Sequence, residues 1–190
     1  GLHSAHRLAG QSNYWAPCGF FEGNYAVTNA DDGAAGQPDT PGGRGVLWQE
    51  TGKTDVSVEV TWNGHHHDQA GPVVCIKVDD IDFGLAFYWE TLLGTYVLWA
   101  LGRVPDDIRI VDSAVQVVVH TEFVPVDLRI EVEGTVVRCY VDNSLKLTST
   151  VPVALRGSTI HGISMDINKI AAPRPDNQMC AIAPWTVFGL

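Results

Sequence analysis

A strict alternation of apolar and polar residues limits this chain to strand-based folds more than any other feature. In TDVSVEVTW, residues 54–62, the two kinds of residue alternate from the first valine onward. LRIEVEGTVVRCYVDN, residues 128–143, repeats the pattern on both sides of Gly134 and closes with Asp142-Asn143. Successive side chains of a strand point to opposite faces, so both segments predict half-buried β-strands. The second segment also predicts a hairpin followed by another turn.

Short apolar segments between Gly, Pro, Asn and Asp residues predict the remaining strands, because those residues favour turns. Residues 30–45 are too rich in Gly, Pro and Asp for any regular element, and residues 63–71 and 171–178 also predict loops. The other predicted strands are residues 72–78, 83–89, 95–101, 108–123, 144–150, 160–167 and 181–190. This spacing predicts an all-β fold, an antiparallel β-sandwich or jelly roll, with residues 1–190 as a single domain.

The composition favours a packed protein that avoids polyanions. Apolar residues make up 45% of the chain, which excludes disorder on composition. With 22 acidic and 12 basic residues the formal charge is −10, so the surface repels nucleic-acid phosphates and anionic membranes. The longest apolar segment, residues 83–101, is interrupted by Glu90 and Gly94 and lacks the about 20 continuous apolar residues of a spanning helix. We expect neither nucleic-acid binding nor membrane insertion.

The four cysteines are too few and too widely spaced to indicate a disulfide framework. Cys75 and Cys139 lie inside predicted strands, where a thiol behaves as a small buried hydrophobe, so we expect both to be free. Cys18 and Cys180 lie near opposite ends of the chain, and they would be able to pair if the terminal strands are neighbours. The sequence leaves open whether they are bridged.

Two pairs of acidic residues have a spacing that places both carboxylates on one strand face. They are Glu131 with Glu133, and Asp55 with Glu59. A glycosidase needs two carboxylates flanking a cleft. The first pair, however, runs directly into the turn at Gly134, and the solvated face of an amphipathic strand explains both pairs. No strained Gly-x-Ser-x-Gly turn is present either. We therefore expect no catalytic residue and no enzyme.

Two further clusters have the composition of metal sites without the spacing. Residues 65–68 read HHHD, but consecutive residues of a loop point in different directions and rarely bind one ion, so a solvated loop is favoured. Asp79, Asp80 and Asp82 are explained by an acidic turn, and calcium binding there stays open. Four other histidines show no spacing that would recruit a partner: His3, His6, His120 and His161. We expect no metal and no cofactor.

The six tryptophans are the remaining functional signal. Exposed aromatic faces pack against the C–H side of sugar rings, and neighbouring polar side chains add directional hydrogen bonds. Core or strand-end positions explain Trp15, Trp48 and Trp185. A core position is also favoured for each other aromatic residue taken singly, although some of them together would make a binding platform. The candidate ligand-binding residues are Trp62, Asn63, His65, His67, Trp89, Tyr96 and Trp99.

The order of these segments resembles the concanavalin A-like (laminin-G-like) jelly roll. More narrowly, it resembles the version found in tail and other virion proteins of phages that infect actinobacteria. The resemblance rests on AGQSNYW, GFFEGNYAVTN, DVSVEVTW, FGLAFYW, LRIEVEGTVVRCYVDN, IHGISMD and WTVFGL, in this order across nearly the whole chain. Each motif is common among β-proteins, so only their order and spacing carry it. The resemblance implies that the final strand lies beside the first. Hydrolases of this fold carry Glu-x-Asp-x-Glu on one strand, a pattern that this chain lacks.

The resemblance implies a virion localisation and a function in adhesion. The domain would be a phage surface or tail module that binds a host-envelope glycan weakly, with several copies acting together. Its partners would be other virion proteins, in a homo-oligomer or a larger assembly. One alternative is a structural capsid or tail decoration protein without a glycan ligand, and another is a polysaccharide-cleaving enzyme of the same fold. A third is a secreted cellular lectin, which a Cys18–Cys180 disulfide would favour.

Overall fold

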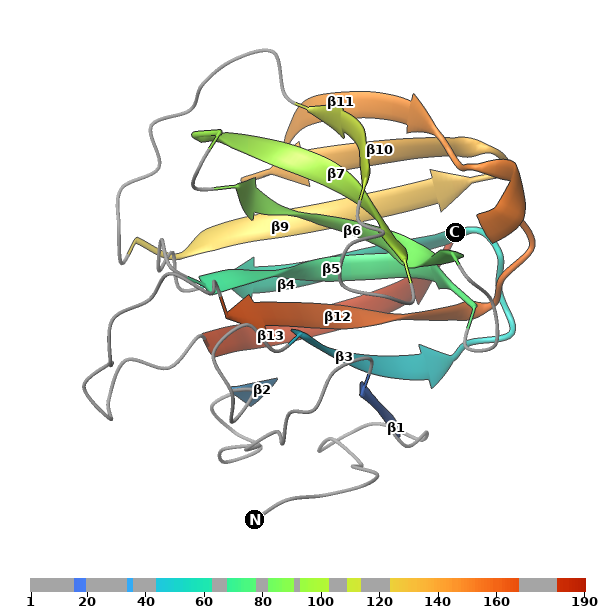
Figure 1. The fold of residues 1–190 in the computed structure, drawn as a ribbon, viewed down its shortest axis with the longest axis horizontal. Coiled ribbons are helices and arrows are strands. Elements are labelled where there is room, and N and C mark those ends of the chain that lie inside the picture. Colours follow the sequence, from blue (N-terminus) through green and yellow to red (C-terminus); the bar gives the residue numbers. More distant parts are fainter. Residues whose placement is uncertain are drawn as a thin grey trace.

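The strands form two antiparallel sheets packed face to face (Figure 1). A computed structural model describes residues 16–19, 34–35, 44–62, 68–77, 82–90, 93–102, 109–113, 124–167 and 181–190. The seven-stranded sheet has the order β1 (Ala16–Gly19), β3 (Arg44–Glu50), β12 (Ile160–Ile167), β5 (Asp68–Ile76), β6 (Asp82–Glu90), β7 (Thr95–Gly102), β8 (Arg109–Ser113). The six-stranded sheet has the order β11 (Ser144–Thr150), β10 (Val136–Val141), β9 (Val126–Glu133), β4 (Val56–Trp62), β13 (Ala181–Gly189), β2 (Ala34–Ala35). A turn of 3-10 helix, η1 (Val153–Leu155), follows β11.

Strands that are distant in the sequence are neighbours in both sheets. In the six-stranded sheet β4 lies between β9 and β13, and in the other sheet β12 lies between β3 and β5. All of these pairs are antiparallel. The predicted fold class, an antiparallel β-sandwich of the jelly-roll type, is confirmed. The described partners of β13 are β4 and β2, while residues 9–15, the segment expected beside it, lie outside the described residues.

The main core lies between the two sheets and is built from every second residue of the predicted strands. On β4, Val58, Val60 and Trp62 are completely buried, and on β6 Leu85 and Phe87 belong to the same cluster. Each such side chain contributes roughly 1.5–3 kcal/mol on burial. A slip of one residue would turn the valines of β4 to the solvent, so the core also fixes the register.

A second, smaller cluster covers the outer face of the seven-stranded sheet. It contains the residues that alternate with the core residues of β5, β6 and β7, so both faces of these strands are apolar. Its buried members are Val73, Ile76, Ala86, Tyr88 and Leu101, with Trp99 and Ile160 packed against them. Residues 84–89, GLAFYW, are therefore continuously apolar because both faces of this part of β6 are buried.

A bulge interrupts the pairing of β5 with β12. The register shifts between Ile160 and Gly162, and at this point Cys75 adopts a left-handed backbone conformation with φ of 58°. Its N–H donates a hydrogen bond to Nδ1 of His161 at 3.2 Å. The completely buried His161 also contacts the carbonyl oxygen of Lys53 through Nε2 at 2.9 Å. A carbonyl can only accept, so Nε2 carries the proton and the ring is neutral.

The two turns predicted in residues 128–143 are present. Gly134 has φ of 59° and is the first residue of the two-residue connection between β9 and β10. Asp142 and Asn143 connect β10 to β11 with φ of 47° and 61°. Two consecutive positive φ angles define a type I′ turn, which matches the twist of antiparallel strands.

Two loop predictions were wrong in part. Residues 30–45 contain β2 and the first residues of β3, because pairing with β13 and β12 supplies partners that local composition does not reveal. β5 begins at Asp68, inside the predicted loop 63–71, where it pairs with β12. Among the described residues, no helix is long and apolar enough to span a membrane. The single-domain assignment stays a prediction.

Candidate functional site

The outer face of the six-stranded sheet carries a group of polar side chains in mutual contact. Four of them, Glu59, Arg129, Glu131 and Tyr140, are partly buried residues of β4, β9 and β10 that point away from the core, and the fifth, Asn143, is exposed in the β10–β11 turn. Tyr140, Arg129 and Glu59 lie opposite one another on the three strands. We call the Arg129 array the set Glu59, Arg129, Glu131, Tyr140 and Asn143.

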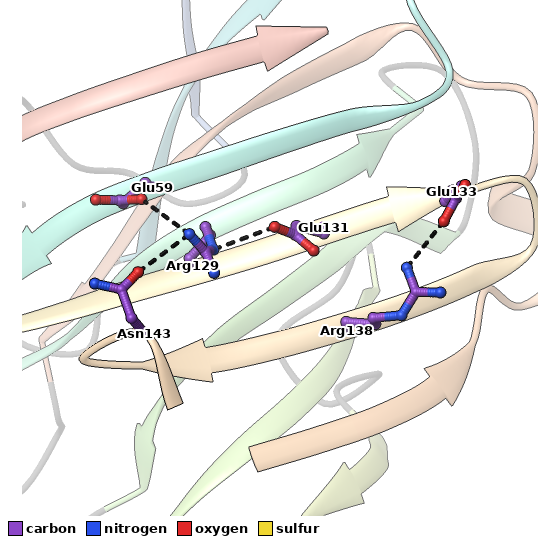
Figure 2. A network of polar contacts seen from close by, with 6 residues as sticks. All are labelled: Glu59, Arg129, Glu131, Glu133, Arg138 and Asn143. Carbon is purple, nitrogen blue, oxygen red and sulfur yellow. Dashed lines mark hydrogen bonds and ion pairs between the residues drawn. The ribbon is translucent and has the colours of Figure 1, made fainter. Parts of the chain in front are cut away.

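Arg129 is the centre of this array, and Figure 2 shows three of its partners pointing toward its guanidinium group. Nη1 donates a hydrogen bond to Oδ1 of Asn143 at 3.2 Å. Carboxylate oxygens lie 3.3 Å from Nε, on Glu131, and 3.7 Å from Nη1, on Glu59. The guanidinium carbon lies 4.2 Å from the centre of the Tyr140 ring, within the range of a cation–π contact. The array therefore holds a planar cation in a fixed position on a rigid sheet.

The guanidinium group has more hydrogen-bond donors than the array uses. An arginine carries five N–H donors. Among the contacts of Arg129 with the described residues, the one to Asn143 has hydrogen-bond geometry. Nε lies within ion-pair distance of Glu131 but without hydrogen-bond geometry, so this buried donor has no hydrogen-bond acceptor among the described residues. Arg129 is held mainly by charge and keeps donors available, and its side chain is 24% exposed.

The β10–β11 turn positions Asn143 beside Arg129. Asp142 donates its N–H to the carbonyl oxygen of Asp127 at 2.9 Å, and the N–H of Asp127 donates to Oδ1 of Asp142 at 3.0 Å. The hydroxyl of Thr61 donates to Oδ1 of Asp127 at 2.6 Å. These three bonds tie the turn to β9 and β4 and so hold the backbone at Asn143 close to Arg129.

The array is acidic overall. Tyr140 contributes no charge, because burial and a hydrogen bond to Glu131 raise its pKa above the ordinary value. A second ion pair lies further along the same face, where Nη1 of Arg138 donates to Oε2 of Glu133 at 3.0 Å (Figure 2). The charged residues at the array and this pair are Glu59, Asp127, Glu131, Glu133, Asp142, Arg129 and Arg138, with a formal charge of −3.

Three of the aromatic residues proposed from the sequence lie in the core. Trp62, Trp89 and Tyr96 are 0%, 5% and 1% exposed, and the rings of Trp89 and Tyr96 meet edge to face with centres 5.0 Å apart. Their rings are therefore not accessible to a ligand at the surface. This agrees with the core position that the sequence favours for each of them. Three other candidates, Asn63, His65 and His67, lie outside the described residues.

Trp99 lies apart from those three, on the outer face of the seven-stranded sheet. It is partly exposed and stacks on the buried ring of Tyr88, with centres 6.3 Å apart and an angle of 23° between the planes. Its Nε1 is buried and has no hydrogen-bond partner among the described residues. Ser164, on β12, is also buried, and its hydroxyl has no hydrogen-bond partner in the part of the chain that the structure describes. The assignment of Trp99 to ligand binding stays a prediction.

The acidic pairs noted in the sequence are engaged in contacts that fit a solvated strand face. Glu131 and Glu133 are each paired with their own arginine. Asp55 accepts a hydrogen bond from the N–H of Gly134 at 2.8 Å and so anchors the β9–β10 turn. Glu59 lies across the sheet, beside Arg129. Among Asp55, Glu59, Glu131 and Glu133, no two carboxylates face each other across a cleft.

The other chemical predictions have different outcomes. Cys75 and Cys139 are free and buried, as expected. Asp79 and Asp80 lie outside the described residues, as does Cys180, so the calcium and disulfide questions stay open. Among the residues that the structure describes, no group of three or more His, Cys, Asp or Glu side chains would hold a metal ion.

The sequence reasoning missed Arg129, Tyr140, Asn143 and the buried His161. The first three are polar or aromatic residues at unremarkable spacing, and they come together only through the register of β9 with β10. Part of this arrangement could be predicted from the sequence. A hairpin with a two-residue turn at Gly134 places Arg129 opposite Tyr140. No sequence signal placed His161 against the bulge at Cys75.

Comparison with known proteins shows likeness in the fold. No family model and no curated protein matches the chain. A carbohydrate-binding module from Bacillus subtilis superposes with a TM-score of 0.63 at 11% identity, covering 91% of this chain and 94% of the module.

Two lectin-type structures are also similar. A single-substitution mutant of the carbohydrate recognition domain of Emp46p gives a TM-score of 0.54 at 12% identity, covering 94% of this chain and 83% of that domain. Chicken galectin 2 gives 0.50 at 10% identity, covering 74% and 97%. At these identities the likeness concerns the backbone alone. The chain therefore has the antiparallel jelly-roll β-sandwich fold that these three proteins share.

Proposed function

We propose that the chain is a non-enzymatic carbohydrate-binding domain and that the Arg129 array is its contact surface. The observation that carries this proposal is a partly exposed arginine held in place by charge, with most of its N–H donors not hydrogen-bonded to the described residues. A rigid sheet positions these donors before a ligand arrives. Binding then costs little side-chain entropy, which matters for a weakly binding surface.

The chemistry of the array matches that of sugar hydroxyls. A hydroxyl both donates and accepts, so it is best bound where a donor and an acceptor are neighbours. Arg129 supplies donors, Glu59 supplies acceptors, and the amide of Asn143 supplies both. The side chain of Glu59 is 38% exposed and Leu145, opposite Tyr140 on β11, is 52% exposed, so polar and apolar atoms are accessible side by side.

The comparisons support this proposal at the level of the fold. Each of the three structures named above is a carbohydrate-binding module, a carbohydrate recognition domain or a galectin. A fold hosts many functions, so the likeness raises the expectation of glycan binding without assigning a site. The assignment of the site rests on the contacts of Arg129.

A polysaccharide-cleaving enzyme is the less favoured function. Cleavage needs two carboxyl groups on opposite sides of the scissile bond. Glu131 and Glu133 are neighbours on one face of β9, and each contacts an arginine. This placement suits recognition rather than acid–base chemistry.

The finer proposal is adhesion of a phage virion to its host. It rests on the resemblance of the strand order to virion jelly rolls, and it implies several copies acting together, because a single surface that binds weakly gains from multivalency. The alternative is a decoration protein that contacts only other virion proteins. That protein would bind no envelope glycan in isolation.

A glycan array of bacterial envelope polysaccharides tests the proposed function with a matched pair of variants. Arg129→Gln removes the central donor, whereas Arg138→Gln removes the same charge from the same face outside the array. Loss of a hydrogen bond to a charged group costs about 1.5–3 kcal/mol, so Arg129→Gln should weaken binding about tenfold or more. Arg138→Gln should stay within about twofold of the natural chain.

The outcomes separate the functions. Equal binding by both variants would move the site away from Arg129, and the Trp99 face would be the next candidate. Absence of binding by the natural chain, together with its incorporation into particles, would favour the decoration protein. Far-UV circular dichroism of each variant confirms that the comparison is made between folded proteins.

A further inference from the structure

We infer that the Arg129 array selects neutral glycans and discriminates against uronic acids, sialic acids and other anionic sugars. This inference rests on the proposed function and names the ligand class of the same site. Taken alone, the guanidinium group of Arg129 would attract an anion. The inference is drawn from the negative charges that surround it.

The positive charge of Arg129 is already compensated. Glu131 lies 3.3 Å from Nε and Glu59 lies 3.7 Å from Nη1, on two different sides of the guanidinium group. An anionic ligand that reached the free N–H groups would come close to both carboxylates. Repulsion from two nearby anions outweighs attraction to one cation when all three lie at similar distances.

The wider surface has the same sign. Asp127 and Asp142 lie at the turn that holds Asn143, and neither has a cationic partner among the described residues. Arg138 is paired with Glu133, so it adds no free positive charge to the face. Over the whole chain the formal charge is −10, so the long-range field also repels anions during approach.

A hydroxyl group fits the gap between Arg129 and Glu59 better than a carboxylate does. The 3.7 Å separation of Nη1 from Oε2 is an ion-pair distance and is too long for a hydrogen bond. A sugar hydroxyl placed beside this gap is able to accept from Nη1 and to donate to Glu59 at the same time. A carboxylate is only an acceptor, so it would leave Glu59 facing another acceptor.

The neighbouring groups suit a sugar with two adjacent hydroxyls. Asn143 already accepts from Nη1 of Arg129, and its NH₂ group is available to donate to a second hydroxyl next to the first. Tyr140 lies under the guanidinium group, so it supports the donor plane and does not act as an open stacking platform. Recognition would therefore depend mainly on a vicinal diol and only slightly on ring stacking.

The test compares neutral and carboxymethylated forms of the same polysaccharides. Mannan, galactan, arabinogalactan and dextran of matched chain length are immobilised in both forms, and binding of the full chain is measured at low and high salt. We expect binding of at least one neutral polysaccharide. Carboxymethylation should weaken that binding about tenfold or more at low salt, and high salt should reduce the difference because it screens the repulsion.

A pair of variants assigns the discrimination to the array. Glu59→Gln removes a carboxylate beside Arg129, and Glu133→Gln removes one from the same face outside the array. Glu59→Gln should reduce the ratio of neutral to anionic binding severalfold. Glu133→Gln should change it by less than about twofold.

Each result has a definite meaning. Equal or tighter binding of the carboxymethylated form would overturn the inference while leaving glycan binding intact. An equal effect of both variants would overturn the assignment of selectivity to Glu59. If neither form of any polysaccharide in the panel binds, the proposed function itself fails.

Discussion

His161 accepts a hydrogen bond from the N–H of Cys75 across the bulge between β12 and β5. The bond requires a neutral imidazole, because a protonated Nδ1 would direct its own proton at that N–H. Burial lowers the pKa of His161 below its usual value, more than the carbonyl oxygen of Lys53 and the charge of Glu50 raise it. The ring thus joins the β3–β4 connection, β5 and β12 through two opposite hydrogen bonds.

We expect the stability of the protein to fall as the pH decreases below about 6.5, the usual pKa of a histidine in an unfolded chain. The unfolded state then binds a proton that the folded state excludes, so the free energy of unfolding decreases until the lower folded pKa is reached. Urea unfolding at about pH 7.5 and about pH 5.5 measures the change.

His161→Gln should cost about 1–3 kcal/mol at the higher pH, because one buried partner is lost. It should also show a smaller pH dependence than the natural chain over the same range. The pKa of Glu50 is lowered, chiefly by a hydrogen bond from the Thr159 side chain, so its contribution is lost only under more acid conditions. An unchanged pH dependence in His161→Gln would show that this histidine is not the titrating group.

Cys75 and Cys139 allow the same substitution to be compared in two backbone conformations. Both side chains are buried, but Cys75 has φ of 58°, whereas Cys139 on β10 does not have a positive φ. A β-branched residue is strained in the left-handed region by roughly 1–2 kcal/mol. Cys75→Val should therefore be less stable than Cys139→Val by about that amount, measured by chemical denaturation. Equal losses would contradict the left-handed conformation at the bulge.

The same two thiols should be unreactive in the folded protein. Burial raises the pKa of Cys75 to about 12 and also raises that of Cys139, so neither is a thiolate near neutral pH. Alkylation with iodoacetamide followed by mass spectrometry should leave both unmodified until denaturant is added. Rapid labelling of either cysteine under native conditions would show that its strand opens readily.

Gly71 and Gly134 should differ sharply in their tolerance of alanine. A Cβ atom on Gly71 would lie 2.0 Å from the carbonyl oxygen of Phe87, a backbone atom that cannot move without disturbing β6. A Cβ atom on Gly134 meets nothing within 4 Å, and only its φ of 59° opposes substitution. We expect a loss of about 3 kcal/mol or more for Gly71→Ala and roughly 1–2 kcal/mol for Gly134→Ala. Similar thermal midpoints for the two variants would refute this close approach of β5 to β6.

The fold was predictable because its strands alternate so regularly. Val56, Val58 and Val60 point inward on β4 as their spacing requires, and the turns at Gly134 and Asp142-Asn143 follow from residues that tolerate positive φ. β2 was not predictable, because two alanines in a Gly-rich segment become a strand only through their pairing with β13. Tertiary partners of this kind leave no local pattern.

The candidate site was less accessible to sequence reasoning. Aromatic content drew attention to Trp62 and Trp89, although the alternation along β4 already favours the buried face for Trp62. On β6, where both faces are apolar, alternation does not distinguish the core face from the outer face. Arg129 meets Glu59 only through the pairing of β9 with β4, and these strands are far apart in the sequence. Such a contact depends on the sheet order, which composition and spacing do not determine.

An NMR titration tests the central claim most directly. The ¹⁵N-labelled chain is titrated with a soluble fragment of whichever neutral polysaccharide binds best among mannan, galactan, arabinogalactan and dextran. If the Arg129 array is the binding surface, the largest shifts will appear at the backbone amides of Arg129, Tyr140 and Asn143. Shifts centred on the Trp99 indole, or amides of the array that stay unchanged at saturation, would contradict the account.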